Sequence, residues 1–139
     1  MTELTVESHL RVRYAETDQM GVVYHTNYLI WMEIGRTDYC RQCGFQYARM
    51  EREEGAFLAV AQVQCRFLAS ARYDDEIVVR TRLGELRSRQ IKFTYTIHRQ
   101  VDNLVLAEGE TVHIVINREG RPMRFPPTYA AMLSQAQHP

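Results

Sequence analysis

The stretch RYAETDQMGVVYHTN, residues 13–27, decides the fold and the expected chemistry of this chain. A strand-like run from His9 to Tyr14 leads into an acidic turn, Glu16-Thr17-Asp18, which Gly21 closes. The cluster His25-Thr26-Asn27 then stands where a long apolar helix begins. Asn, Thr and Asp accept hydrogen bonds from the free N–H groups of helix starts. The stretch therefore brings a carboxylate close to the positive end of a helix dipole, where developing negative charge is stabilised.

The helix that follows is predicted from Tyr28 to Cys43, with Gly44 at the position that ends helices. Its polar residues form only a narrow stripe, so we expect it to be wrapped on several sides rather than to lie on a surface. Gly35, in its middle, costs about 1 kcal/mol relative to Ala. A close approach of the helix backbone to a sheet would justify that cost.

Beyond a predicted charged loop (Arg49 to Gly55), the pattern changes to the period of two that is typical of strands. The predicted strands are Ala61–Phe67, Ile77–Leu83, Ile91–Ile97 and Val105–Asn117, and a short helix, Thr128–Gln137, follows Pro126-Pro127. The fold class is therefore α+β: one curved antiparallel sheet wrapped around one long central helix, in a single domain spanning residues 1–139. A single sheet of this size leaves its edges and outer face uncovered, which predicts oligomerisation.

Composition excludes several classes of protein. The net charge is zero and the pI is about 7.0, so nothing supports a nucleic-acid partner. Cys40 and Cys43 are two residues of an odd set of three cysteines, and no second Cys or His pair follows at zinc spacing. We therefore expect that the chain has no metal site and that its thiols are reduced, which indicates a cytoplasmic protein. The first ten residues lack the pattern of a signal peptide, and no apolar run is long enough to span a membrane.

The chain resembles a known family at three places. The residues that carry the resemblance are Tyr14, Thr17-Asp18, Gly21 to His25, Asn27-Tyr28, then Ala71 to Asp75, and finally Gly120 to Pro122 with Arg124 and Pro126. On these motifs the sequence is similar to the hotdog-fold acyl-CoA thioesterases, in the group related to 4-hydroxybenzoyl-CoA thioesterase and the bacterial Tol-Pal-cluster (YbgC-like) thioesterase. The similarity covers nearly the whole chain.

The resemblance implies hydrolysis of an acyl-CoA thioester to a free acid and CoA. Asp18 would be the catalytic carboxylate, either attacking the thioester carbonyl or activating water. The backbone N–H of His25 would point at the thioester oxygen from the helix start. The resemblance also implies a homodimer with its active site at the subunit interface, often paired into a homotetramer, and no metal or cofactor.

Each of these residues also has a plainer interpretation. Asp18 followed by Gly21 is common in ordinary turns, and the imidazole of His25 could simply cap the helix. Glu16 is expected to be solvated, because it would point away from Asp18 in an extended segment. Asp74-Asp75 indicates a hairpin turn, and His113 is expected to be a hydrogen-bonded histidine of the core or of an interface.

Substrate contacts are assigned to Gly21, Val23, Tyr24, Tyr28, Arg87 and Arg89. The tyrosines would form pocket walls. The arginines would contact the CoA phosphates, since the guanidinium group binds phosphate with two parallel hydrogen bonds. Arg118, Arg121 and Arg124 are further candidates for that role.

Two other functions fit the same residues. One is an acyl-ACP thioesterase of the same fold, and the other is a non-catalytic acyl-CoA-binding sensor. The aromatic residues near the motif suit an aryl group and a fatty chain equally, so the sequence leaves the acyl group open.

Overall fold

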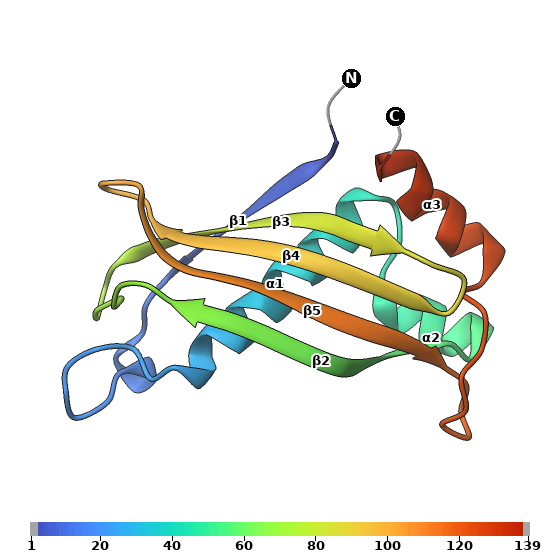
Figure 1. The fold of residues 1–139 in the computed structure, drawn as a ribbon, viewed down its shortest axis with the longest axis horizontal. Coiled ribbons are helices and arrows are strands. Elements are labelled where there is room, and N and C mark those ends of the chain that lie inside the picture. The colour runs from blue at the N-terminus through green and yellow to red at the C-terminus, as the bar shows by residue number, and fades with distance from the viewer. Residues whose placement is uncertain (1–2, 138–139) are drawn as a thin grey trace.

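The computed structural model describes residues 3–137, which form five strands and three α-helices (Figure 1). The strands are β1 (Thr5–Arg11), β2 (Phe57–Phe67), β3 (Glu76–Leu86), β4 (Gln90–Arg99) and β5 (Leu104–Ile116), and the helices are α1 (Thr26–Gln42), α2 (Tyr47–Glu54) and α3 (Pro127–Gln137). Residues 1–2 and 138–139 of the predicted domain lie outside the described residues. No helix in the described part combines the length and apolar character that a membrane crossing needs.

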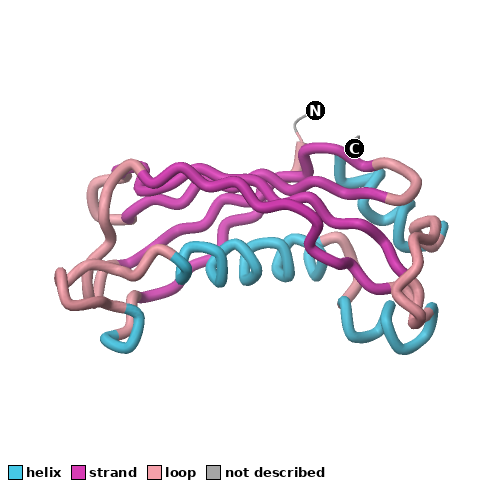
Figure 2. Tube along the Cα trace, turned by 60° about the horizontal axis from the view of Figure 1, so that its bottom comes forward, coloured by secondary structure: helices cyan, strands magenta, loops and turns pink. Residues whose placement is uncertain are grey.

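The five strands form one antiparallel sheet in the order β1-β3-β4-β5-β2. The sheet arches over α1, which runs along its concave side (Figure 2). β2 lies at one edge and pairs only with β5. The prediction of a curved antiparallel sheet around one long helix is confirmed.

The period-two patterns predicted the buried side of the central strands correctly. Successive side chains of a strand point to opposite faces, and those that point toward α1 are buried. They are Ile77, Val79, Thr81 and Leu83 of β3 and Ile91, Phe93, Tyr95 and Ile97 of β4. This face and the apolar side of α1 make the core.

The helix α1 is covered on one side only. Trp31 and Met32 have no exposed surface, whereas Ile30 and Ile34 are 49% and 38% exposed. The expectation that the sheet wraps the helix on several sides is therefore wrong for a single protomer. The reason is that a five-stranded sheet reaches around only part of the helix circumference.

Gly35 lies where α1 comes closest to the sheet. A β-carbon at this position would overlap the Thr81 hydroxyl oxygen and come within 3.0 Å of Val79 Cγ1. The close approach that the helix glycine predicted is therefore present, and it explains why a poor helix former stands there.

We expect Gly35→Ala to destabilise the fold by about 1–3 kcal/mol, because overpacking outweighs the gain in helix propensity. Chemical denaturation measures this change. Adding Thr81→Ala, which removes the overlapping hydroxyl, should recover part of the loss. A Gly35→Ala variant more stable than the parent would show that the helix can shift freely.

Several predicted elements were wrong in their bounds or type. β2 starts at Phe57 rather than Ala61, and β1 starts at Thr5 rather than His9. Residues assigned to a charged loop form α2, which buries Met50 and ends at Gly55, a residue with φ of +62°. β1 ends at Arg11, before the predicted end, because the chain turns into a 3-10 helix at Tyr14–Glu16. In both places the composition is charged, and the element buries one side chain, Met50 in α2 and Glu16 in the 3-10 helix.

Candidate active site

The acidic turn is a short hairpin. Thr17 and Val23 pair as an antiparallel bridge, the Asp18 N–H donates to the Val22 carbonyl (2.9 Å), and the Gly21 N–H donates to the Asp18 carbonyl (2.9 Å). Gly21 has φ of +79°, a conformation that L side chains rarely adopt. Glycine is therefore needed to close this hairpin, which agrees with its place in the motif.

The side chain of Asp18 is half-buried and only partly engaged. Its Oδ1 accepts a hydrogen bond from the Met20 N–H (2.8 Å). Within residues 3–137, Oδ2 accepts no hydrogen bond and Asp18 forms no ion pair. One oxygen is thus used to orient the carboxylate, while the other remains available to a substrate or a water molecule.

The hairpin is joined to the second motif of the sequence. Val22 forms a bridge with Arg72, and the Val23 N–H donates to the Ala71 carbonyl (2.9 Å). The Ala71 N–H in turn donates to the hydroxyl of Tyr28 (3.1 Å). The two motifs therefore form one structural unit at the start of α1.

Tyr28 is buried against Trp31 and Phe67, and burial raises the pKa of its hydroxyl. Its hydroxyl accepts the hydrogen bond from the Ala71 N–H, so Tyr28 helps to hold α1 and the 71–75 motif in position at the site. Tyr24, by contrast, is about half exposed and stacks against the His25 ring at 4.6 Å.

The start of α1 has unused hydrogen-bond donors. His25 precedes the helix, and no side chain caps it. Within the described residues, neither the His25 N–H nor the Thr26 N–H donates a hydrogen bond. The His25 imidazole is exposed and lies beside the aromatic rings of Tyr24 and Phe67. The positive end of the helix dipole is therefore open to an anionic oxygen.

Glu16 is not solvated, as the sequence suggested, but 5% exposed. Its carboxylate accepts hydrogen bonds from the Trp31 indole N–H (3.0 Å) and the Arg13 N–H (2.8 Å). The 3-10 turn of residues 14–16 directs the side chain inward, which an extended segment would not do. The Glu16 carboxylate reaches back to the Arg13 N–H, as the acidic residue of a capping box does, but Arg13 lacks the side-chain acceptor that would mark such a box in the sequence.

The predicted phosphate-binding arginines lie far from Asp18 in the same protomer. Arg87 and Arg89 belong to the turn between β3 and β4, at the end of the sheet where α1 finishes. The 17 residues of α1 correspond to about 25 Å of helix. One protomer therefore does not bring the predicted catalytic and phosphate-binding residues together.

Arg87 and Arg124 line the same cavity, of about 500 Å³, whose floor is apolar. The floor residues include Met123, Phe125, Pro126 and Pro127. Arg118, another predicted arginine, instead donates to carbonyl oxygens of Glu51 and Arg52 at the end of α2 (3.3 Å each).

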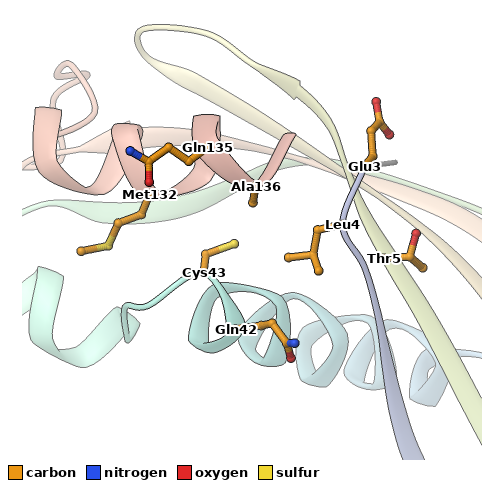
Figure 3. A pocket seen from close by; sticks show the side chains of 8 residues that line it. All are labelled: Glu3, Leu4, Thr5, Gln42, Cys43, Met132, Gln135 and Ala136. Carbon is orange, nitrogen blue, oxygen red and sulfur yellow. The ribbon is translucent and has the colours of Figure 1, made fainter. Parts of the chain in front are cut away.

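A larger cavity, of about 810 Å³, lies between the start of β1, the end of α1 and α3 (Figure 3). Cys43, Leu4 and Met132 line it, and none of the residues predicted to be functional does. All three cysteines of the chain are free thiols. Burial raises the pKa of the Cys43 thiol to about 11, which leaves it protonated and a poor nucleophile at neutral pH.

His113 is buried and its Nε2 is hydrogen-bonded to Thr111 Oγ1 (2.8 Å), as predicted for a core histidine. Thr111 Oγ1 also bonds the Tyr95 hydroxyl (2.7 Å). Burial, followed by the nearby charge of Arg36, lowers the pKa of His113 to about 4. Among residues 3–137, no group of three His, Cys, Asp or Glu side chains gathers to hold a metal ion.

Comparison with known proteins shows which proteins this chain is similar to. A family model described as the thioesterase-like superfamily matches residues 12–133. The Bacillus subtilis protein YneP is 34% identical over 120 residues, covering 86% of each chain. An acyl-CoA thioester hydrolase of Escherichia coli, YbgC, is 30% identical over 127 residues, covering 91% of this chain and 93% of its own.

A solved structure shows the same fold. The DHNA-CoA thioesterase from Staphylococcus aureus superposes with a TM-score of 0.90 at 30% identity, covering 96% of this chain and 91% of that one. Strands β2 to β5, the central helix and the segment that carries Asp18 fall within residues 12–133, the part that the family model matches.

Proposed function

This chain belongs to the thioesterase-like superfamily with the hotdog fold, and we propose that it hydrolyses acyl-CoA thioesters with Asp18 as its catalytic carboxylate. Asp18 either attacks the thioester carbonyl, forming an anhydride that water then hydrolyses, or takes a proton from the attacking water and passes it to the leaving thiolate. The N–H groups at the start of α1 stabilise the negative oxygen that forms. The carbon–sulfur bond breaks, and the products are the free acid and the thiol of CoA.

One observation carries this proposal. In the described residues, the carboxylate oxygen Oδ2 of Asp18 has no partner, and the hairpin that holds it is tied to a helix start at which the His25 and Thr26 N–H groups are also unpaired. A group that accepts a proton or attacks carbon and a group that stabilises an oxyanion are the two requirements of thioester cleavage. Both are present in one rigid unit.

We further propose that the enzyme is a homodimer whose partners pair through β2. Within residues 3–137 no strand pairs with the outer edge of β2, and the side chains on its inner face include Val60, Val63 and Phe67, which are 51%, 41% and 49% exposed. An exposed apolar edge strand of 11 residues favours pairing with another strand. The opposite edge, β1, carries Glu7 and Arg11, which disfavour such pairing.

Antiparallel pairing of two β2 strands brings opposite ends of the protomers together. Phe67, at the end of β2, contacts His25 and Tyr28 at the start of α1. Phe57, at the start of β2, pairs with Ile116 at the arginine end of the sheet. The Asp18 hairpin of one protomer thus lies beside the Arg87 turn of its partner. In this arrangement the Asp18 hairpin and the arginine turn, which lie far apart within one protomer, meet across the subunit interface and form the active site there.

The arginine contribution has a selective test. We expect Arg87→Ala to raise KM for acyl-CoA thioesters about tenfold, the scale of a lost charge-assisted hydrogen bond. It should leave unchanged the KM for the same acyl groups on N-acetylcysteamine, which lacks the nucleotide. Steady-state kinetics over short-chain, long-chain and benzoyl-type thioesters measures both, and the panel also identifies the acyl group.

The control is Arg80→Ala, which removes an exposed arginine paired with Glu7 on the outer face of the sheet (2.7 Å). Its KM should stay within about twofold of the parent value, the scale of weakly coupled surface charges. Hydrolysis of acyl-ACP but not acyl-CoA would indicate the carrier-protein enzyme instead. Tight acyl-CoA binding without hydrolysis would indicate a sensor and would contradict the proposed function.

A further inference from the structure

Glu16 connects the acidic hairpin to the interior of the protein. Its Oε2 accepts a hydrogen bond from the indole N–H of Trp31 (3.0 Å), and Trp31 is fully buried on α1. Its Oε1 accepts from the Arg13 N–H (2.8 Å), where the chain enters the turn. The side chain is 6% exposed. A buried carboxylate is costly unless it is hydrogen-bonded, so both contacts hold it in one orientation.

The backbone of Glu16 holds the other end of the hairpin. Its carbonyl accepts hydrogen bonds from the Tyr24 N–H (2.9 Å) and from the Asn27 side-chain amide (3.0 Å). Residue 16 therefore contacts the chain on both sides of the hairpin that carries Asp18. It also contacts α1 at Asn27 and at Trp31.

We propose that Glu16 is a positioning residue, whose carboxylate, held by the Trp31 indole, fixes the Asp18 carboxylate relative to the free N–H groups at the start of α1. The proposal rests on the function proposed above for Asp18. A displacement of about 1 Å between reacting groups can cost about 100-fold in rate. The tie between the hairpin and the helix is thus a requirement of catalysis as well as of folding.

Glutamine cannot replace this carboxylate. Each carboxylate oxygen faces an N–H donor, and a carboxamide offers only one acceptor oxygen. Its NH₂ group would therefore face the N–H of Arg13 or Trp31. Glu16→Gln keeps the size of the side chain while breaking one of the two hydrogen bonds and removing the ion pair of Oε1 with the exposed Arg13 guanidinium (3.6 Å). It therefore perturbs the structure less than a truncation would.

We expect Glu16→Gln to lower kcat about tenfold to 100-fold with KM within about twofold, because substrate contacts remain while the catalytic geometry is loosened. The matched control is Glu53→Gln, which removes the carboxylate of an exposed pair with Arg49 on α2 (3.1 Å). It should not change kcat. Thermal unfolding of both variants verifies that they are folded at the assay temperature.

A double substitution tests whether the effect passes through the indole. Trp31→Phe removes the N–H donor, so in that background the NH₂ group introduced by Glu16→Gln no longer faces a competing donor on α1. We expect Glu16→Gln to lower kcat less than about twofold further in Trp31→Phe. Such non-additivity is the signature of two groups in direct contact. Equal losses in both backgrounds would overturn the proposal.

A structural readout separates this proposal from the chemistry of Asp18. Trp31 is the one tryptophan of the chain, so a ¹H–¹⁵N spectrum contains a single indole N–H signal. Glu16→Gln should shift that signal and increase hydrogen exchange at the Tyr24 N–H at least about tenfold, whereas Asp18→Asn should do neither. Unchanged exchange or unchanged kcat in Glu16→Gln would overturn the positioning role. Full activity of Asp18→Asn would instead overturn the proposed function and leave the hairpin tie intact.

Discussion

Asp18→Asn is expected to lower kcat at least about 100-fold, the scale of losing a positioned general base or nucleophile. Asparagine is nearly the same size and keeps a carbonyl oxygen that can accept the Met20 N–H, as Asp18 Oδ1 does. The hairpin should therefore remain in place, and only the negative charge and its proton affinity are lost. Steady-state kinetics on every thioester that the parent accepts, together with thermal unfolding, measures the result.

Asp74→Asn is the matched control, because Asp74 lies in the neighbouring turn and undergoes the same chemical change. Its φ of +69° suits asparagine at least as well as aspartate. Its contact with Arg11 (3.4 Å) is exposed and worth little. Activity of this variant should stay within about twofold of the parent. Turnover near the parent level by Asp18→Asn on all accepted substrates would contradict the proposed mechanism.

A mixed dimer of two impaired variants should contain one intact active site. We expect a heterodimer of an Asp18→Asn protomer and an Arg87→Ala, Arg89→Ala protomer to show about half of the parent kcat/KM. In a two-fold symmetric dimer with composite sites, one site carries every substitution and the other carries none. Co-expression with two different affinity tags yields the heterodimer for kinetics.

If Asp18 and the arginines of the same protomer formed the site, each site of the mixed dimer would contain either Asp18→Asn or the two arginine substitutions. Its activity would then equal the average of the two parent variants. That outcome, or a protein that sediments as a monomer at assay concentration, would contradict the interfacial site. The two parent homodimers, prepared with the same tags, are the controls.

Local patterns in the sequence predicted most of the fold correctly. The alternation of Phe93 and Tyr95 with polar neighbours, for example, indicated which side of β4 is buried. Side-chain direction in a strand is set by the two-residue repeat, so it can be read without knowing the partner strand. Gly35 and Gly21 were also informative, because each stands where a side chain fits poorly. Gly35 lies where the helix touches the sheet, and Gly21 has a positive φ.

Predictions for residues whose structure depends on a contact with a distant part of the sequence were wrong. Glu16 looked solvated because its partner, Trp31, is 15 residues away in the sequence. The charged segment that forms α2 looked like a loop because its apolar contribution to the core is small, chiefly Met50. In both cases the deciding contact joins segments that only the folded chain brings together.

By itself the sequence determined the class of fold and the hairpin motif, because these follow from periodicity and turn chemistry over a few residues. The role proposed for the Asp18 carboxylate followed from the resemblance to the thioesterase family. Only the tertiary structure decided that Glu16 is buried, that the 71–75 motif supports the Asp18 hairpin, and that Arg87 lies a helix length away from it. The physical reason is that burial and distance are properties of packed elements. They depend on which strand lies beside which, and that order is β1-β3-β4-β5-β2 here, not the order of the chain.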